Sequence, residues 1–150
     1  SGDNYHRIFE PPTNYIPNPL ILYLNLIDSF DKCILITEPD RENPIVHELM
    51  KINKVQVQSS TVADDFATLM SARNVALSGV GTFAMAAALC STRIKNLYTT
   101  NLLLTEHLNY SMMHNTDVEL HVMDLENYLP VFPCSWKNTE EQRKFILDYR

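Results

Sequence analysis

The sequence predicts an α/β fold, with a Rossmann-like parallel sheet and helices on both of its faces. Short apolar strand patterns alternate with helical patterns through the middle of the chain. Residues 33–37 (CILIT) form a short continuous apolar run, as expected for a strand that is covered on both faces. Polar residues follow the expected strands. At 150 residues the chain has the length of one domain, and we expect a single domain over 1–150.

The elements follow one another at short spacing. Residues 1–19 are rich in Pro and Asn and are expected to form a loop that emerges from a strand lying before Ser1. Apolar residues then recur at helical spacing from Leu20 to Phe30, with Pro19 suited to the first turn. Further strands are expected at 33–37, 55–58, 75–77, 94–98 and 118–122, the last as a strand or an extended edge. Further helices are expected at 44–51, at 61–72, from 82 onward, and at 139–149. Thr61 and Asp64 are suited to a capping box at the start of the helix at 61–72, and Phe66, Leu69 and Met70 are expected to form its buried face.

The segment from Asn74 to Ser91 joins a strand to an Ala-rich helix through a Gly-containing turn. Gly79 and Gly81 permit positive φ and close approach of the backbone, and Thr82 is a possible helix N-cap. The free N–H groups of the first helical turn then form an anion site. The alternative is that the glycines only make the corner tight.

Composition excludes several classes of function. The net charge is −6 and Lys and Arg do not cluster, which argues against a nucleic-acid groove. No Cys or His spacing typical of a zinc site is present, and we expect no metal. Cys33 and Cys90 lie in apolar runs and are expected to be small core residues. No apolar stretch reaches the length of a membrane span.

Ligands of such sheets bind beyond the carboxyl ends of the strands. The expected strand ends carry polar clusters at Asp3 and Asn4, at 38–40, at 59–65 and at 78–83, the last beginning with Ser78. Glu38 either holds a ribose or a sugar, or belongs to a solvated turn beside Pro39. Because all four polar clusters lie at expected strand ends, together they predict a ligand site at this edge of the sheet.

Three of these strand ends together resemble the carboxyl-terminal half of GT-B glycosyltransferases, especially the fucosyltransferase-like superfamily. Ser1-Gly2-Asp3 is similar to the tail of that family's His-x-Arg-x-Gly-Asp segment. The stretch 65–72 is similar to its D-F-x-x-L-x-x-A helix, and Gly81-Thr82-Phe83 to its Ser-Thr-Phe turn, with Gly in place of Ser. The segment from Trp136 to Gln142 resembles its last helix.

The resemblance implies one half of a GT-B fold that transfers a sugar, with GDP-fucose as the implied donor, to a glycan hydroxyl. It implies inversion at the sugar and neither a metal nor another cofactor, because amides and cations stabilise the leaving diphosphate. The partners would be the sugar nucleotide, the glycan acceptor and an amino-terminal acceptor domain that 150 residues leave no room for. We therefore expect the isolated chain to bind nucleotide weakly and to be inactive in transfer.

Residue roles follow from the same resemblance. Gly81, Thr82 and Phe83 would line the diphosphate, and Asp65 would lie near the base or the helix that holds it. Asp3 would stabilise the phosphate loop or face the donor sugar. Read from the residues alone, Asp65 is a helix N-terminal acid. Glu10 would be a general base that reaches the acceptor, or a loop acid.

Two other functions remain open. The first is a non-catalytic nucleotide-binding or scaffold domain, in which Gly81 marks a degenerate donor pocket. The second is another small α/β domain, such as a flavodoxin-like receiver or a regulatory nucleotide sensor. Localisation is left open: the resemblance implies the Golgi or endoplasmic reticulum lumen for a eukaryotic chain and the cytoplasm for a viral or bacterial one.

Overall fold

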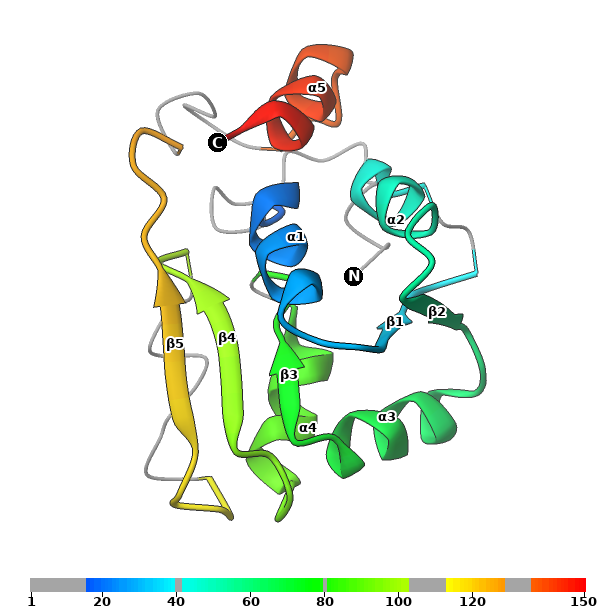
Figure 1. Cartoon of the computed structure of the whole chain (residues 1–150), viewed down its shortest axis with the longest axis vertical. Coiled ribbons are helices and arrows are strands. Elements are labelled where there is room, and N and C mark those ends of the chain that lie inside the picture. The colour runs from blue at the N-terminus through cyan, green and yellow to red at the C-terminus, as the bar shows by residue number, and fades with distance from the viewer. Residues whose placement is uncertain (1–15, 40–41, 80, 103–112, 129–135) are drawn as a thin grey trace. The chain divides into compact units, whose positions relative to one another are not determined.

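Every strand pairing in the described part of the chain is parallel. The computed structural model describes residues 16–39, 42–79, 81–102, 113–128 and 136–150. β1 pairs with β2 in one small sheet, and β4 lies between β3 and β5 in another. Helices connect the successive strands up to β4, as parallel pairing requires. The α/β class with parallel strands is therefore confirmed, and it is consistent with a Rossmann-like fold (Figure 1).

The elements lie close to their predicted positions. In chain order they are α1 (Leu20–Asp28), β1 (Cys33–Ile36), α2 (Pro44–Leu49), β2 (Val55–Gln58), α3 (Val62–Ser71), β3 (Asn74–Ala76), α4 (Thr82–Cys90), β4 (Asn96–Thr100), β5 (Glu119–Met123) and α5 (Glu140–Asp148). The last strand is a true strand, because β5 pairs with β4 over its whole length. β4 begins and ends two residues later than predicted.

The chain folds as two compact units. Unit 1 comprises residues 1–59 and 128–150, and unit 2 comprises residues 60–127. Each is described below by itself, and the single-domain interpretation of 1–150 stays a prediction.

Unit 1 holds α1, β1, α2, β2 and α5. Its core combines residues that precede or belong to α1 with residues from 128 onward. Three residues near the end of the chain are buried: Tyr128, Trp136, which precedes α5, and Ile146 on α5. The Tyr128 hydroxyl donates a hydrogen bond of 2.6 Å to the carbonyl oxygen of Pro17, which precedes α1. Trp136, which precedes α5, is thus part of the buried core of this unit.

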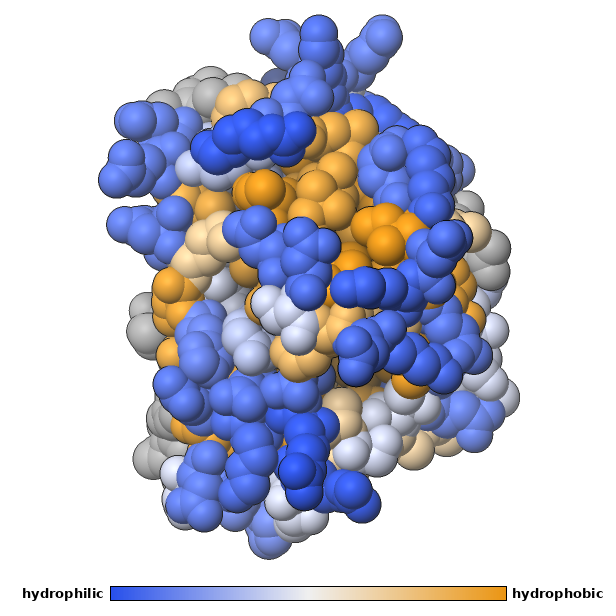
Figure 2. Space-filling view, viewed as in Figure 1, coloured by the Kyte–Doolittle hydropathy of each residue, from blue (hydrophilic) through white to orange (hydrophobic). Residues whose placement is uncertain are grey.

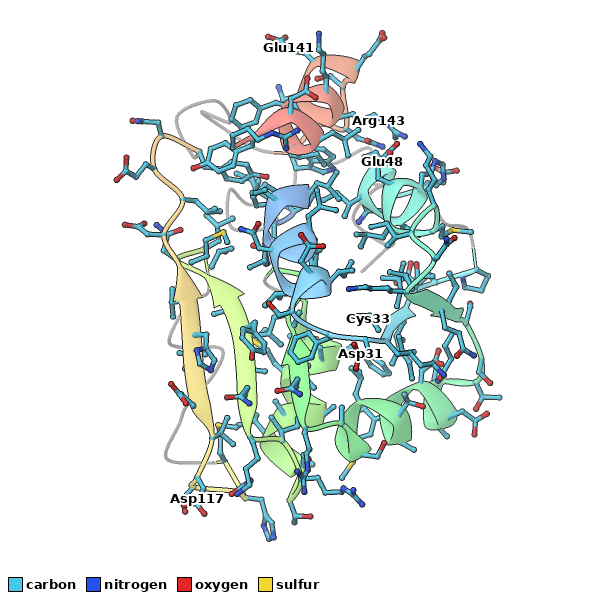
Figure 3. All side chains as sticks on the ribbon, in the orientation of Figure 1. Asp31, Cys33, Glu48, Asp117, Glu141 and Arg143 are labelled. Carbon is cyan, nitrogen blue, oxygen red and sulfur yellow. The ribbon has the colours of Figure 1, made fainter. Side chains whose placement is uncertain are left out.

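Two further hydrogen bonds lie within this unit, one at Tyr23 and one at Arg143. Burial raises the pKa of the Tyr23 hydroxyl, and a hydrogen bond with Asn18 opposes that shift in part. Arg143 of α5 donates to the Asn138 side chain at 3.1 Å, just before the helix (Figure 3).

Unit 2 holds α3, the three-stranded sheet and α4. In the view of Figure 1, α4 lies behind the sheet. One face of the sheet packs against this helix in a core of buried apolar residues, which are Val75, Leu77, Met85, Ala88, Ile94, Leu97, Met113 and Val118. Leu69 and Ala72, at the end of α3, pack against the same core.

The other face of this sheet is polar. Asn96 of β4 donates to the Asn74 side chain at 2.8 Å and lies 3.0 Å from His121 Nε2 on β5. The His121 ring stacks on Tyr98, with ring centroids 4.7 Å apart. Hydrophilic side chains cover the viewed face of β4 and β5 in Figure 2. Parallel sheets normally carry apolar side chains on both faces, so this row departs from the expected pattern.

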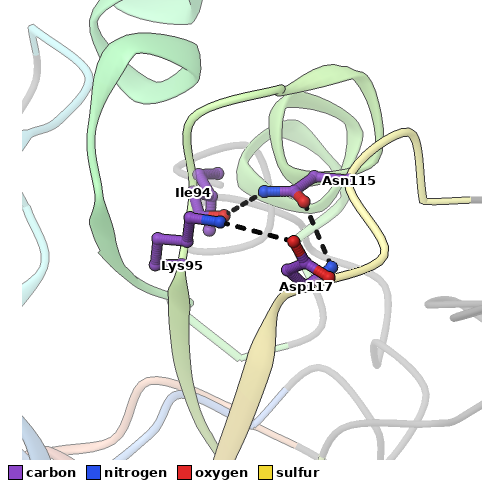
Figure 4. A network of polar contacts seen from close by, with 4 residues as sticks. All are labelled: Ile94, Lys95, Asn115 and Asp117. Atoms are coloured by element: carbon purple, nitrogen blue, oxygen red, sulfur yellow. Dashed lines mark hydrogen bonds and ion pairs between the residues drawn. The ribbon is translucent and has the colours of Figure 1, made fainter.

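A small polar network fixes the amino ends of β4 and β5 (Figure 4). Asn115 donates to the Ile94 carbonyl at 2.7 Å and accepts from the Asp117 N–H at 3.1 Å. The Asp117 carboxylate forms an ion pair of 3.7 Å with Lys95. Both side chains of that pair are exposed, so we assign it little stabilising energy.

Several local expectations were wrong. Cys90 is exposed and Cys33 is only half-buried, so neither is a fully buried core residue. Ile34 is 49% exposed, so β1 is not covered on both faces. Pro19 is the N-cap of α1 and not part of its first turn. In α3 the apolar side chains are at most half-buried, and the one buried residue is the carboxylate Asp65.

Candidate functional site

The corner between β3 and α4 contains Gly79, Gly81 and Thr82, the residues of the predicted anion site. Gly79 is buried and has φ of 107°, a conformation that disfavours any residue with a Cβ. Gly81 has φ of −64° and is the N-cap of α4, so glycine is not required there. The expectation that Thr82 caps this helix was wrong: Thr82 is the first helical residue, because the chain turns helical directly after Gly81.

The N-terminus of α4 has no cap from a side chain. No capping hydrogen bond and no acidic residue of the first turn satisfy its N–H groups within the described chain. α1 shares this property, but residues 16–20 at its start are all buried. At α4, by contrast, Thr82 and Phe83 are exposed and Gly81 is half-buried. Backbone N–H groups and the positive end of the helix dipole therefore face an accessible surface.

The N-terminus of α3 is already neutralised by the chain itself. Thr61 accepts from the Asp64 N–H at 3.1 Å, and the Asp64 carboxylate accepts from the Thr61 hydroxyl at 2.8 Å. This capping box was predicted from the sequence and is confirmed. The Ser60 hydroxyl also donates to Asp64, at 3.0 Å. Hydrogen bonds from Thr61 and Ser60 hold the pKa of Asp64 below its ordinary value.

Asp65 has a second task at the same end of α3. It is 8% exposed, and its two carboxylate oxygens accept from the Ser60 N–H at 3.3 and 3.2 Å. The carboxylate thus folds the turn before α3 back onto the helix. This contact matches the interpretation of Asp65 as a helix N-terminal acid, and its predicted place near a nucleotide base stays a prediction.

An aromatic contact brings the two helix starts together. Phe66 of α3 and Phe83 of α4 pack edge to face, with ring centroids 5.5 Å apart. Asp65 precedes one ring and Gly81-Thr82 precede the other. The structure therefore places Asp65 and the Gly81 corner at the same end of unit 2. Of the two neighbouring helix starts, one is closed by its own carboxylates and the other is open to an anion.

The remaining predicted site residues have different positions. Ser78 is exposed, directly before Gly79 at the corner. Glu38 is half-buried and lies in unit 1, two residues after the end of β1, and its part in the ligand site stays a prediction. Asp3 and Glu10 lie outside the described residues.

Sequence reasoning missed two groups of polar residues. The first is the row formed by Asn74, Asn96 and His121 on the polar sheet face. Its signal was present as polar residues at alternate positions of the strands. The second is Thr99, which is 1% exposed and whose hydroxyl has no hydrogen-bond partner among the described residues. A buried threonine inside a strand gives no signal in the sequence that separates it from a core residue.

Two other kinds of feature are absent from the described residues. No group of three His, Cys, Asp or Glu side chains arranged to hold a metal occurs in the part of the chain that the structure describes. Among the same residues, no helix combines the length and the apolar character that crossing a membrane requires.

Comparisons with known proteins add no relative. No protein-family model matches the chain, and no curated protein and no solved structure matches it. The likeness to fucosyltransferases therefore rests on the sequence motifs alone.

Proposed function

We propose that this chain is the donor-binding domain of a glycosyltransferase and that the N-terminus of α4 binds the diphosphate of a sugar nucleotide. One observation carries the proposal: the start of α4 is accessible, and no side chain among the described residues caps it, at the carboxyl end of a parallel strand. In open α/β sheets this is where phosphate groups bind.

The chemistry of the corner suits a phosphate in an acidic protein. With a net charge of −6 and no cluster of cations in the sequence, the chain must hold an anion mainly by backbone N–H groups and hydroxyls. Ser78 and Thr82 are exposed on the two sides of Gly79 and Gly81. Each hydrogen bond to a charged acceptor contributes about 1.5–3 kcal/mol. Two or three such bonds give binding in the millimolar to micromolar range.

Phe83 supports a ligand larger than phosphate. Its ring is 38% exposed although it contacts Phe66, so part of one aromatic surface is free beside the helix start. Stacking of a base on an aromatic side chain is worth about 1–3 kcal/mol in nucleic-acid complexes. A nucleoside or sugar attached to the bound diphosphate can use this surface. Guanosine and fucose, the groups implied by the motif resemblance, are the specific proposal.

A second candidate is a nucleotide-binding domain without catalytic activity. The position of Asp65 favours it, because both carboxylate oxygens are engaged by the Ser60 N–H and serve the local fold. The replacement of the family's Ser by Gly81 also removes one hydroxyl donor. In this case the corner binds the diphosphate, but no sugar is transferred.

Calorimetry separates these proposals from a chain that does not bind nucleotide. We expect heat on titration with GDP and with GDP-fucose, and none with guanosine, because the diphosphate supplies most of the binding energy. Absence of both heat and a thermal shift at millimolar GDP would contradict both candidates. Transfer of labelled fucose to a glycan by any protein that contains this chain, abolished when its α4 corner is mutated, would favour the enzyme over the non-catalytic domain.

A further inference from the structure

The buried hydroxyl of Thr99 calls for a physical explanation. Thr99 is 1% exposed, and its Oγ1 atom has no hydrogen-bond partner in the described structure. Most buried polar side-chain atoms in proteins have a partner, since a buried group without one loses its hydration and gains nothing. The adjacent Thr100 shows the usual arrangement, because its Oγ1 accepts from the Leu102 N–H at 3.3 Å.

The strand register places Thr99 beside the α4 corner. Ala76 pairs with Tyr98, and the Leu77 N–H donates to the Tyr98 carbonyl at 2.9 Å, so Leu77, the residue after β3, lies next to Thr99 of β4. Tyr98 lies on the polar face, where it stacks on His121. Since side chains alternate along a strand, Thr99 lies on the opposite face, which α4 covers.

The same face leads directly to the helix start. Leu77 belongs to the core that includes Met85, in the first turn of α4. The next residue after Leu77 is Ser78, where the turn to α4 begins. Thr99 lies one residue before the end of β4, at the carboxyl edge of the sheet. The unpartnered hydroxyl and the uncapped N–H groups are therefore found at the same edge and on the same face.

We propose that the Thr99 hydroxyl is a ligand of the phosphate bound at the N-terminus of α4, to which it donates a hydrogen bond from the neighbouring strand. This inference rests on the proposed function and adds a residue that none of the sequence motifs contains. A hydroxyl from β4 lets the site contact the phosphate from a second side, which a helix N-terminus alone cannot do. It also explains why a polar group is kept in an otherwise apolar core face.

The test compares Thr99→Val with Thr99→Ser in the whole chain, using GDP and inorganic pyrophosphate as probes. Val keeps the shape of Thr and removes the hydroxyl, so the ligand-free protein should unfold at the same temperature or higher. Its affinity for both probes should fall about tenfold, since a bond to a charged oxygen is lost. Thr99→Ser should bind within about threefold of the unchanged chain.

A matched control is Thr100→Val, which removes the hydroxyl that accepts from Leu102 on the other face of the sheet. It should lower the unfolding temperature and leave the affinity of the folded protein unchanged. If Thr99→Val binds GDP as well as the unchanged chain does, the Thr99 inference is wrong while the proposed function stands. If the unchanged chain binds neither probe, both are wrong. Thr99→Ala serves as the second hydroxyl-free variant if the Val side chain prevents folding.

Discussion

Replacement of Gly81 by Asp should separate the stability of the fold from the binding of an anion. Gly81 is the N-cap of α4 with φ of −64° and ψ of 127°, which any L-residue adopts without strain. An Asp side chain at this position can accept from the free N–H groups of the first turn. It also adds a negative charge at the positive end of the helix dipole.

The two effects have opposite signs. Asp in place of Gly at an N-cap contributes a few tenths of a kcal/mol, and the dipole about 0.3–1 kcal/mol more. The ligand-free variant should therefore unfold roughly 1–4 °C higher. GDP should bind about 10- to 100-fold more weakly, because the carboxylate occupies phosphate donors worth about 1.5–3 kcal/mol each and repels the diphosphate.

The matched variant is Gly81→Ser, which provides a neutral cap and restores the hydroxyl found in the motif that the segment resembles. It should gain a similar small stability and bind GDP at least as tightly as the unchanged chain. Stability is read from thermal unfolding followed by circular dichroism, and affinity from calorimetry. If the Asp and Ser variants bind GDP equally well, the anion does not bind at this helix start and the reasoning is refuted.

Other predictions concern the scaffold around the site. Gly79→Ala should cost at least about 1 kcal/mol in urea unfolding, since φ of 107° brings a Cβ into a clash; an unchanged midpoint would count against this backbone conformation. Thr61→Val should return the pKa of Asp64 toward its ordinary value of 3.8, as NMR titration of the carboxyl can measure. Because the folded-state pKa is depressed, the stabilisation from Asp64 is complete above pH about 4 and is lost as the pH falls through the folded pKa. The unchanged chain should thus lose more stability than Thr61→Val as the pH falls from about 5 to about 2, and equal losses would contradict the capping box. Tyr128→Phe should cost about 1–3 kcal/mol, because the buried carbonyl of Pro17 loses its donor at 2.6 Å; an unchanged free energy of unfolding would argue that the bond contributes nothing.

Much of the fold could be predicted because local signals were consistent with the tertiary structure. The β2 strand has the predicted bounds, and Thr61 with Asp64 forms the predicted capping box. Thr139 caps α5 through the Gln142 N–H in the same way. At such positions the side chain that starts the element also satisfies its backbone, so the sequence alone carries the information.

The errors arose where burial depends on distant partners. Cys90 ends an apolar run and yet is exposed, because the run continues around the helix and only one side of α4 faces the sheet. Ile34 lies in a continuous apolar run and yet is 49% exposed, because no element covers that face of β1 in the described structure. Neither outcome follows from hydrophobicity along the chain.

The candidate site was predictable in part for the same reason. The Gly turn between β3 and α4 was a weak local signal. It placed the corner between strand and helix correctly, but it assigned the cap to Thr82 instead of Gly81. The contact between Phe66 and Phe83 needs the packing of two helices, and the buried Thr99 hydroxyl needs the register of two strands. No spacing within one segment encodes these relations.

The most direct test of the account is an amide NMR titration of the chain with GDP, compared with guanosine. Binding of a diphosphate at the start of α4 should move the amide resonances of Thr82, Phe83 and Ala84 most strongly, and guanosine at the same concentration should leave them in place. Shifts that centre on other segments, or none at these three amides with GDP at millimolar concentration, would contradict the central claim.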